Sequence, residues 1–438
     1  MLPTRRLVCL LAYGAPLWIV AAVAPGGFLL GAVYILCLVT LCLWEAYRLP
    51  AAGVFQVTRE LPHRFSLDAV QTITLRLHNG SALWLRLRVR DELPAALEYA
   101  DTAVLLESTL APQQTLQLAY QVRSLQRGLH AFGDVVFRLE HGFGLLQQQL
   151  RLPIHDEIKV YPHCVALHDY ALLIRIDQRH EVIRQARHAR GRGTDFESLR
   201  PYVAGEDLRT VDWKASARRG TLVSRNLQVE KGQQVAVLVD AGRLMTERIG
   251  KLTRFDHALN ATVMLSYVAQ KRGDSMAVAT FSNRIESFLP PTHGQHLVPR
   301  VLESLYRVQP RALEADYWHV VATVLTRLKR RSLVIILTDV LDAAASSGLM
   351  TNLVRAVAKH LVLCVVLTEP RLAALADASP GDVAQTYTKA AAAQILWQRH
   401  LALEQMRAKG ILVLETDPWH FSVQLVRRYL EIRQGALL

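Results

Sequence analysis

The chain contains few of the residue patterns on which catalysis and metal binding depend. Cysteine occurs five times in 438 residues, no two cysteines have C-x-x-C spacing, and three of the five lie in the apolar N-terminal segment. Such an odd, scattered set excludes a disulfide framework and a cysteine-based zinc site, and it suits a reducing compartment. The sequence also lacks a G-x-S-x-G nucleophile elbow, an H-E-x-x-H motif and a G-x-x-x-x-G-K-S/T phosphate loop. These absences argue against the hydrolases, metalloproteases and nucleotide-binding enzymes that the motifs mark.

Acidic residues are in the minority, with 38 Asp and Glu against 51 Lys and Arg and a formal net charge of +13. A basic balance of this size favours nucleic acid, an acidic protein or an anionic membrane surface as partner. The basic residues are spread along the chain and interleaved with acids, which argues against a dedicated nucleic-acid groove. Attraction to anionic lipid headgroups suits a membrane-tethered body better.

Two uncharged apolar runs, Leu7–Ala24 and Gly27–Trp44, occupy the N-terminus. Each is about 18 residues long, which is near the minimum for a transmembrane helix. The sequence therefore predicts a transmembrane hairpin over residues 1–48. A cleaved signal peptide is the alternative, because Ala22-Val23-Ala24 resembles a small-residue cleavage site. Pro25 directly after that site and the second apolar run argue against cleavage.

Arginines flank the predicted hairpin on one side. Arg5 and Arg6 precede the first run, Arg48 follows the second, and the turn between the runs carries no charge. The positive-inside rule then places both ends of the hairpin in the cytoplasm. We expect two transmembrane helices in the inner (cytoplasmic) membrane, with the soluble body in the cytoplasm.

Residues 50–162 show the alternation of half-buried strands. Apolar residues recur at every second position in Ile73–Leu77, Leu85–Val89, Leu116–Val122 and Val135–Leu139, and turn residues separate these runs. Short alternating strands of this kind predict an antiparallel β-sandwich of immunoglobulin-like type.

Residues 229–438 alternate between strand and helix patterns. The first strand is the continuous apolar run Val235–Val239, which ends at Asp240. Such runs are typical of buried parallel strands, and their alternation with helices predicts a Rossmann-like, doubly wound α/β sheet. Ligands of such sheets bind at the carboxyl ends of the strands.

Between these regions, residues 163–228 form a connector with a dense cluster of glycines, charged residues and aromatics. The candidate site residues of this stretch are Gly191, Gly193, Phe196, Arg200, Tyr202, Gly205, Asp207, Arg209, Asp212, Trp213 and Arg218. Arginine forks match carboxylates bidentately, so Arg200 and Arg209 are expected to pair with Asp207 and Asp212. Trp213 is predicted to anchor the segment in a core, whereas Arg218 is expected to be exposed. Three interpretations of this stretch remain open. It could be a network of ion pairs that joins two domains, a recognition surface for a partner, or a catalytic site.

This connector resembles the signature of a bacterial domain-of-unknown-function family, DUF58. The shared pattern runs G-x-G-x-D-F-x-x-L-R-x-Y-x-x-G-E-D-x-R-x-V-D-W-x-x-S-A-R from Gly191 to Arg218. The resemblance implies a membrane hairpin, a β-rich domain, the signature and a C-terminal von Willebrand A-like domain. It also implies a MoxR-type AAA+ ATPase as partner, with a role as adaptor in protein assembly or maturation. The run from His141 to Leu145 stands where the family usually has D-P-F-G-L, so this chain departs from the pattern there.

The same resemblance bears on metal binding. Metal-binding von Willebrand A domains carry D-x-S-x-S at the end of the first strand, whereas this chain has Gly242 and Leu244 at the serine positions after Asp240. Two oxygen ligands of a hard divalent cation are thereby lost. Asp240 and Asp339 remain as a degenerate metal site that holds Mg²⁺ weakly or not at all. We expect no cofactor and expect Asp240 to cap a helix N-terminus.

These observations together predict a non-enzymatic, membrane-anchored interaction protein or adaptor. An uncharacterised hydrolase that uses the Asp and Arg residues of the signature is one alternative. A basic binder of nucleic acid or of a lipid surface is the other, although no nucleic acid is expected.

Overall fold

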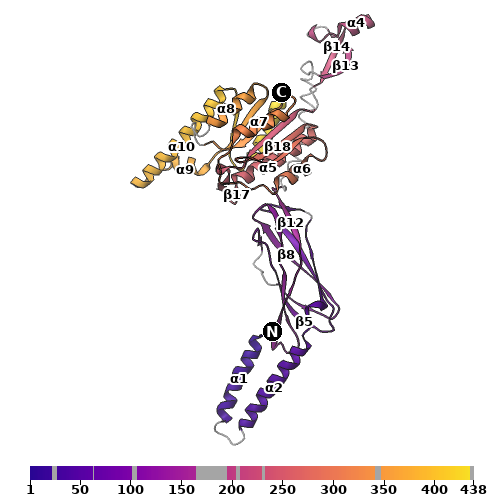
Figure 1. Ribbon diagram of the computed structural model, residues 1–438, viewed down its shortest axis with the longest axis vertical. Coiled ribbons are helices and arrows are strands. Elements are labelled where there is room, and N and C mark those ends of the chain that lie inside the picture. The colour runs from indigo at the N-terminus through magenta and orange to yellow at the C-terminus, as the bar shows by residue number, and fades with distance from the viewer. Residues whose placement is uncertain are drawn as a thin grey trace. The chain divides into compact units, whose positions relative to one another are not determined.

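The computed structural model describes residues 1–21, 27–62, 64–100, 106–163, 195–203, 208–228, 232–340 and 347–434. The chain divides into two units, Met1–Val160 and Tyr161–Leu438 (Figure 1).

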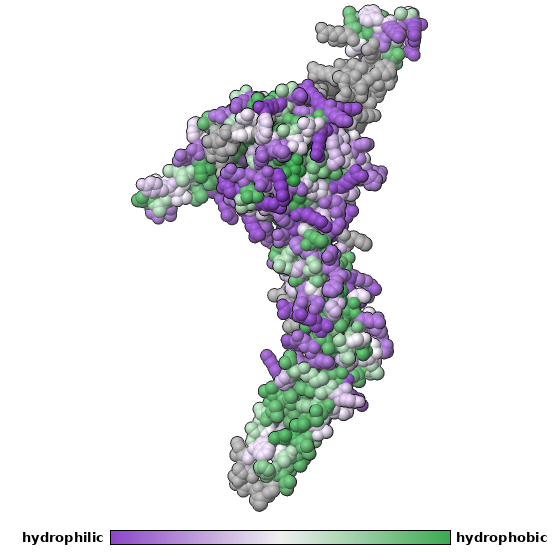
Figure 2. Space-filling view, in the orientation of Figure 1, coloured by the Kyte–Doolittle hydropathy of each residue, from purple (hydrophilic) through white to green (hydrophobic). Residues whose placement is uncertain are grey.

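Two apolar helices, α1 (Arg5–Ala21) and α2 (Gly27–Arg48), begin the first unit and pack against each other. The Tyr34 hydroxyl donates to the Leu10 carbonyl at 2.6 Å, and the rings of Trp18 and Phe28 meet edge to face. Hydrophobic residues cover much of the surface of this helix pair (Figure 2). Among the described residues, one helix, Phe28–Arg48, is long and apolar enough to cross a membrane. The second predicted span, over α1, stays a prediction.

The rest of the first unit consists of antiparallel strands whose inward side chains form one core. One sheet has the order β1-β11-β10-β5-β7, a second has the order β2-β4-β8-β6, and β3-β12-β9 form a third. Their bounds are β1 Leu2–Pro3, β2 Phe55–Glu60, β3 Phe65–Ser66, β4 Val70–Asn79, β5 Leu85–Asp91, β6 Leu97–Tyr99, β7 Leu106–Leu110, β8 Thr115–Ser124, β9 Gly128–Ala131, β10 Val135–Glu140, β11 Leu146–Leu152 and β12 Glu157–Tyr161. Leu85, Leu87 and Val89 of β5 all point inward, as the alternation predicted.

Strand β2 carries a buried arginine, Arg59. The Arg59 guanidinium donates to both oxygens of Asp91, at 2.9 and 2.6 Å, and to Asp156 at 2.9 Å. The Tyr120 hydroxyl also donates to Asp91. Removing either Arg59 or Asp91 would leave the other charge buried without a partner. Such a loss lowers the free energy of unfolding by several kcal/mol.

The helices are joined to the strands by Glu45, in the last turn of α2. Its carboxylate accepts from the backbone N–H groups of Gly144, Leu145 and Leu146 at 2.9, 2.9 and 3.0 Å, and Glu45 is buried. The loop 141–145 after β10 is therefore held by the second helix. On the side of α1, Arg6 donates to the Phe143 carbonyl at 3.1 Å. The loop that departs from the family pattern is thus the point of attachment of both helices.

The second unit is built on a six-stranded sheet of order β19-β18-β15-β20-β21-β22. The five strands β15, β18, β20, β21 and β22 are parallel, and β19 is antiparallel at the edge. The strands are β15 Gln234–Asp240, β18 Ser275–Phe281, β19 Ile285–Thr292, β20 Leu333–Thr338, β21 Leu361–Leu367 and β22 Leu412–Thr416. Their apolar runs are buried on both faces, which gives the continuous pattern seen in the sequence.

Helices cover both faces of this sheet (Figure 1). Val235, Val237 and Val239 face α5 (Arg254–Arg272), α6 (Leu297–Leu305) and α11 (Phe421–Gln434). Ala236 and Leu238 face α7 (Tyr317–Arg327), α8 (Ser347–Val357) and α10 (Val383–Ala408). The predicted doubly wound order of strands and helices is therefore found in this unit. Short elements complete it: η3 Arg243–Thr246, β16 Arg248–Ile249, β17 Leu252–Thr253 and α9 Pro370–Asp377.

The ends of α5 show how local sequence fixes an element. Thr253 caps its N-terminus in a reciprocal capping box with Asp256, and Gly273 closes its C-terminus at a φ of 76°. A glycine tolerates this left-handed conformation without steric cost. Gly273 therefore ends α5.

Candidate functional site

The described part of the signature folds as a small hairpin with a helix. Strand β13 (Asp195–Pro201) pairs with β14 (Val223–Gln228), and η2 (Leu208–Thr210) and α4 (Trp213–Arg219) lie between them in the chain. The Asp212 carboxylate accepts from the Ala215 N–H at 2.9 Å and caps α4. Ser216 of α4 is buried, and its hydroxyl accepts from the Val223 N–H at 2.9 Å. These bonds fix the helix against β14.

The hairpin exposes large apolar side chains where β13 ends and β14 begins. The exposed fractions are 58% for Val203, 59% for Leu208, 64% for Trp213 and 47% for Leu222. Backbone bonds hold these residues together, since Tyr202 N–H donates to the Leu222 carbonyl and Asp212 N–H to the Val223 carbonyl, both at 2.9 Å. We call Val203, Leu208, Trp213 and Leu222 the signature patch.

The prediction that Trp213 anchors the segment in a core is wrong. Trp213 is the first residue of α4, whose buried side is formed by the small Ser216. The hairpin itself buries only Val211 and Val223 among its described apolar residues. A core of that size cannot enclose an indole, so the side chain lies in solvent.

The other predicted signature residues are placed as follows. Arg200 lies on β13 opposite Ser224, and Tyr202 follows the strand. Arg218 is exposed, as expected. Phe196 lies on β13 and Arg209 in η2. Gly191, Gly193, Gly205 and Asp207 lie outside the described residues, so the ion pairs expected of Asp207 stay a prediction.

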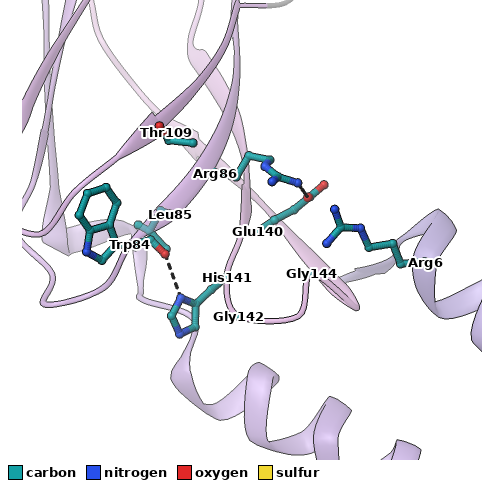
Figure 3. A pocket seen from close by; sticks show the side chains of 9 residues that line it. All are labelled: Arg6, Trp84, Leu85, Arg86, Thr109, Glu140, His141, Gly142 and Gly144. Atoms are coloured by element: carbon teal, nitrogen blue, oxygen red, sulfur yellow. Dashed lines mark hydrogen bonds and ion pairs between the residues drawn. The ribbon is translucent and has the colours of Figure 1, made fainter.

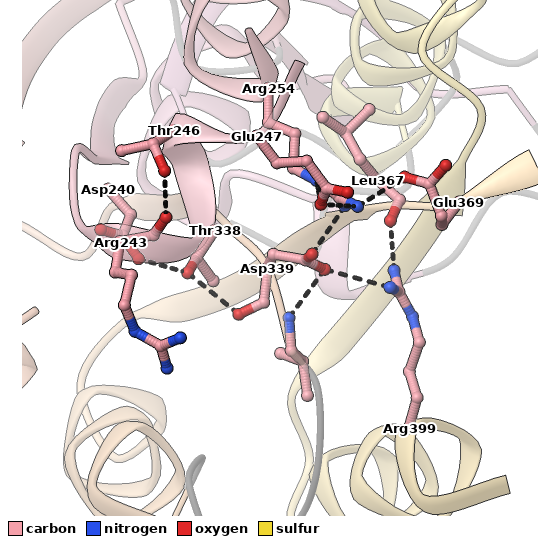
Figure 4. Close-up of polar contacts among 11 residues, drawn as sticks. Asp240, Arg243, Thr246, Glu247, Arg254, Thr338, Asp339, Leu367, Glu369 and Arg399 are labelled. Carbon is pink, nitrogen blue, oxygen red and sulfur yellow. Dashed lines mark hydrogen bonds and ion pairs between the residues drawn. The ribbon is translucent and has the colours of Figure 1, made fainter. Parts of the chain in front are cut away.

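Asp240 and Asp339 follow neighbouring strands of the large sheet, at its carboxyl edge (Figure 4). Asp240 is buried, and three neutral donors hold its carboxylate: the Gly242 N–H at 2.7 Å, the Tyr317 hydroxyl at 2.6 Å and the Thr338 hydroxyl at 2.7 Å. Burial raises the pKa of the Asp240 carboxyl, and the three hydrogen bonds oppose that rise. Burial and the neighbouring carboxylate raise the pKa of Tyr317, so its hydroxyl stays a donor.

Asp339 is held by two arginines instead. Arg254 of α5 lies 2.6 Å from one carboxylate oxygen, and Arg399 of α10 lies 3.1 Å from the other. Arg254 also contacts Glu369 at 2.6 Å and Glu247 at 2.7 Å. All these side chains except Glu247 are buried. The two guanidiniums join α5 and α10 to the carboxyl edge of the sheet.

Sequence reasoning missed these two arginines. Arg399 did leave a signal, because Arg399, Ala402, Leu403 and Met406 follow the spacing of one helix face and all four are buried. An arginine on an otherwise apolar stripe indicates a buried partner. Arg254 lies 85 residues before Asp339, and nothing local to either residue predicts that pair.

The carboxyl edge does not fit a divalent cation. The Asp240 oxygens already accept three hydrogen bonds, and the Asp339 oxygens contact two cations. Within the described ranges, no group of three or more His, Cys, Asp or Glu residues is arranged to hold a metal ion. Arg243, which follows Gly242, is exposed, and its side chain points away from Asp240 (Figure 4).

The expected helix cap at Asp240 is also wrong in detail. The short helix η3 begins after Gly242, and Asp240 instead accepts from the N–H two residues ahead, as in an Asx turn. Gly242 is needed at this turn because a Cβ there would lie 2.9 Å from Asp240 Oδ1 and 2.9 Å from the Leu313 carbonyl oxygen. A serine at position 242 therefore cannot restore a metal ligand without moving the backbone.

The site therefore defines a class of protein with two features. The first is an α/β unit in which Asp240 and Asp339, at the carboxyl edge of the sheet, already have protein partners. The second is a hairpin with exposed apolar side chains that precedes this unit in the chain. Residues 198–395 match the model of a family described as protein of unknown function DUF58. The uncharacterized protein YeaD of Bacillus subtilis (strain 168) is 20% identical over 240 residues, which is 50% of this chain and 57% of that protein. The chain thus spans little more than half the length of this relative.

Two solved structures resemble parts of the chain weakly. A PapD-like domain of human CEP192 is 10% identical, with a TM-score of 0.18 over 26% of this chain and 89% of that one. The cupredoxin domain of amoB from Nitrosocaldus yellowstonii is 14% identical, with a TM-score of 0.15 over 21% of this chain and 55% of that one. Similarities at this level carry no argument about fold or function.

Proposed function

We propose that this protein is a non-enzymatic, membrane-anchored adaptor that binds a protein partner through the signature patch. The exposure of Trp213 with Val203, Leu208 and Leu222 carries this proposal. Contiguous exposed apolar side chains mark interaction sites on soluble surfaces. Tryptophan is also among the residues that most often dominate binding energy at protein interfaces.

Basic residues border the signature patch. Lys214, Arg218 and Arg219 of α4 are all exposed, so the apolar centre has a positive rim. That arrangement suits an interface whose core is apolar and whose rim steers an acidic partner surface.

The C-terminal unit acts in this proposal as a von Willebrand A-like domain that works without a metal ion. Arg254 and Arg399 supply the positive charge next to Asp339 that a cation would otherwise supply. The first unit would combine a two-helix membrane hairpin with an immunoglobulin-like sandwich. Arginines on both flanks of the hairpin support a cytoplasmic body at the inner membrane.

The partner proposed is a MoxR-type AAA+ ATPase, and the process is protein assembly or maturation. The resemblance of the signature to DUF58 supports this choice. The Asp212 carboxylate caps α4, and this engagement argues against its use in hydrolysis.

Photo-cross-linking tests the proposal. The full-length protein carries a photo-reactive phenylalanine analogue at position 213, and the matched control carries it at position 397. Trp397 is 67% exposed on α10, against 64% for Trp213 on α4. We expect cross-links to the AAA+ ATPase from position 213 and few from position 397. Equal cross-linking from both positions, or none from 213, would contradict the proposal.

A further inference from the structure

A cavity of about 330 Å³ lies in the first unit, where the start of α1 meets the loop after β10 (Figure 3). Its polar lining includes Arg6, Arg86, Glu140 and His141, and Trp84 forms one side. The volume is at the lower end of the ~300–1,000 Å³ that small-molecule sites span. It suits a compact polar group rather than a large ligand.

Two arginines and one carboxylate line this cavity. A Cβ added to Gly144 would lie 3.4 Å from Arg6 Nη1 and 3.8 Å from Glu140 Oε2, so both groups lie close to Gly144. Arg86 Nη1 is 3.9 Å from Glu140 Oε2, which is beyond hydrogen-bond distance, and the Arg86 side chain is 51% exposed. The Glu45 carboxylate lies beside the same loop, because a Cβ on Gly142 would be 3.2 Å from Glu45 Oε1.

The Glu45 carboxylate faces the backbone of the loop. It accepts three backbone N–H groups of the loop, and such bonds compensate a buried carboxylate. The guanidinium groups, in contrast, retain donors: Arg6 Nη1 contacts the Phe143 carbonyl, and a guanidinium has five N–H groups. Planar forks of this kind match the oxygens of a phosphate.

Aromatic side chains surround the same end of the unit. Trp44, Tyr47, Trp84 and Phe143 are 42%, 93%, 67% and 59% exposed. Trp44 and Tyr47 belong to the last turns of α2, and a Cβ on the cavity residue Gly142 would lie 3.6 Å from the Trp44 ring. Tryptophan and tyrosine at the end of an apolar helix mark the depth of lipid headgroups.

We propose that this cavity binds the phosphate of an anionic phospholipid headgroup, with Arg6 and Arg86 as its cationic ligands. The inference rests on the proposed membrane anchorage of α1 and α2. The remaining N–H donors of the two guanidiniums suit the oxygens of a phosphodiester. The apolar helix surface beside the cavity fits the acyl chains (Figure 2), and a soluble phosphate makes no use of that surface.

Lipid titration of the purified full-length protein in detergent, followed by native mass spectrometry, tests this proposal. The probes are phosphatidylglycerol, phosphatidylcholine, inorganic phosphate and glycerol 3-phosphate. The double variant Arg6→Gln with Arg86→Gln is compared with the control Arg5→Gln with Arg88→Gln. The control removes the same charge from the same helix and strand, but neither Arg5 nor Arg88 lines the cavity.

We expect the wild type to bind phosphatidylglycerol more tightly than phosphatidylcholine. The cavity variant should bind it about tenfold more weakly, as expected for the loss of charge-assisted hydrogen bonds. The control should stay within about twofold of the wild type, since neither Arg5 nor Arg88 lines the cavity and salt screens charges that face solvent. The single variant Arg86→Gln, at a half-exposed strand position, should show part of the loss if Arg6→Gln disturbs folding.

Equal weakening in the cavity variant and its control would overturn the proposal, because it would indicate general charge attraction. Binding of inorganic phosphate or glycerol 3-phosphate as tight as that of the lipid would overturn the lipid source. Membrane anchorage is tested separately by alkaline carbonate extraction. Release by carbonate contradicts the anchorage, whereas failed lipid binding by a protein that resists extraction contradicts the cavity alone.

Discussion

The buried carboxylate of Asp240 is surrounded by neutral hydrogen-bond donors. Its environment makes the free energy of unfolding depend on pH. Burial raises the pKa of this carboxyl in the folded protein above the ordinary value. The unfolded chain titrates near pH 3.9. Between these two pKa values the folded state binds more protons than the unfolded state. The free energy of unfolding contributed by Asp240 therefore falls as pH rises through this interval, and it is greatest below the unfolded pKa.

Asp240→Asn should remove that pH dependence. The amide does not ionise, and the hydroxyls of Tyr317 and Thr338 can rotate to accept from it. We expect the melting temperature of the variant to fall less than that of the wild type from about pH 4 upward. The measurement is thermal unfolding of the full-length protein at a series of pH values. Asp377→Asn, at an exposed carboxylate, is the control, and parallel curves for Asp240→Asn and wild type would contradict the assignment.

Asp240 and Asp339 show how far individual site residues could be predicted from the sequence. Their position at the ends of strands followed from local apolar runs, so Asp240 and Asp339 were found. Their partners Arg254 and Arg399 were missed, because each comes from a helix far away in the chain. Gly242 and Leu244 offer no side-chain oxygen, but the turn that requires a glycine at position 242 was not visible in the sequence.

At the scale of elements, periodicity predicted most of the sheet of the second unit. The run Val235–Val239, predicted as the first buried strand, became β15. Strand β19 was missed because Pro290 and Pro291 interrupt its pattern. Prolines cannot donate to a ladder, and the strand is tolerated because it lies at the edge.

Glu45 joins two elements that the sequence treats as separate, a helix and a loop 96 or more residues away. Glu45→Ala leaves three backbone N–H groups of the loop without this acceptor. Each unmatched buried donor costs about 1–3 kcal/mol, so the free energy of unfolding should fall by about 2–4 kcal/mol if water reaches some of them. Thermal and urea unfolding in detergent, followed by tryptophan fluorescence, measures this loss.

Glu45→Gln should lie between the wild type and Glu45→Ala, because it keeps one acceptor oxygen. Glu60→Ala is the control, since Glu60 forms a surface pair with Arg76 in which both side chains are about half exposed. Its effect should stay within about 0.5 kcal/mol. Wild-type stability in Glu45→Ala would show that the loop does not depend on the helix.

At the scale of the whole molecule, the order of helices, antiparallel strands, signature and α/β unit was predictable from changes in hydrophobic pattern along the chain. The role of the signature was not. The dense charges and Trp213 suggested a buried network of ion pairs with the tryptophan in a core. Burial of a side chain, however, depends on how much apolar surface surrounds it. Val211 and Val223 offer too little, and the tryptophan became part of the signature patch instead.

The most direct test of the central claim is the affinity of the full-length protein for the purified MoxR-type ATPase, measured for wild type, Trp213→Ala and Trp397→Ala. Trp213→Ala should weaken binding by about 30-fold, the effect of losing about 2 kcal/mol at an interface hot spot. Its melting temperature should match that of the wild type, because exposed positions contribute within about 0.5 kcal/mol. Trp397→Ala should bind as the wild type does. A Trp213→Ala variant that keeps full affinity, or one that loses stability instead of affinity, would contradict the claim that the signature patch is a recognition surface.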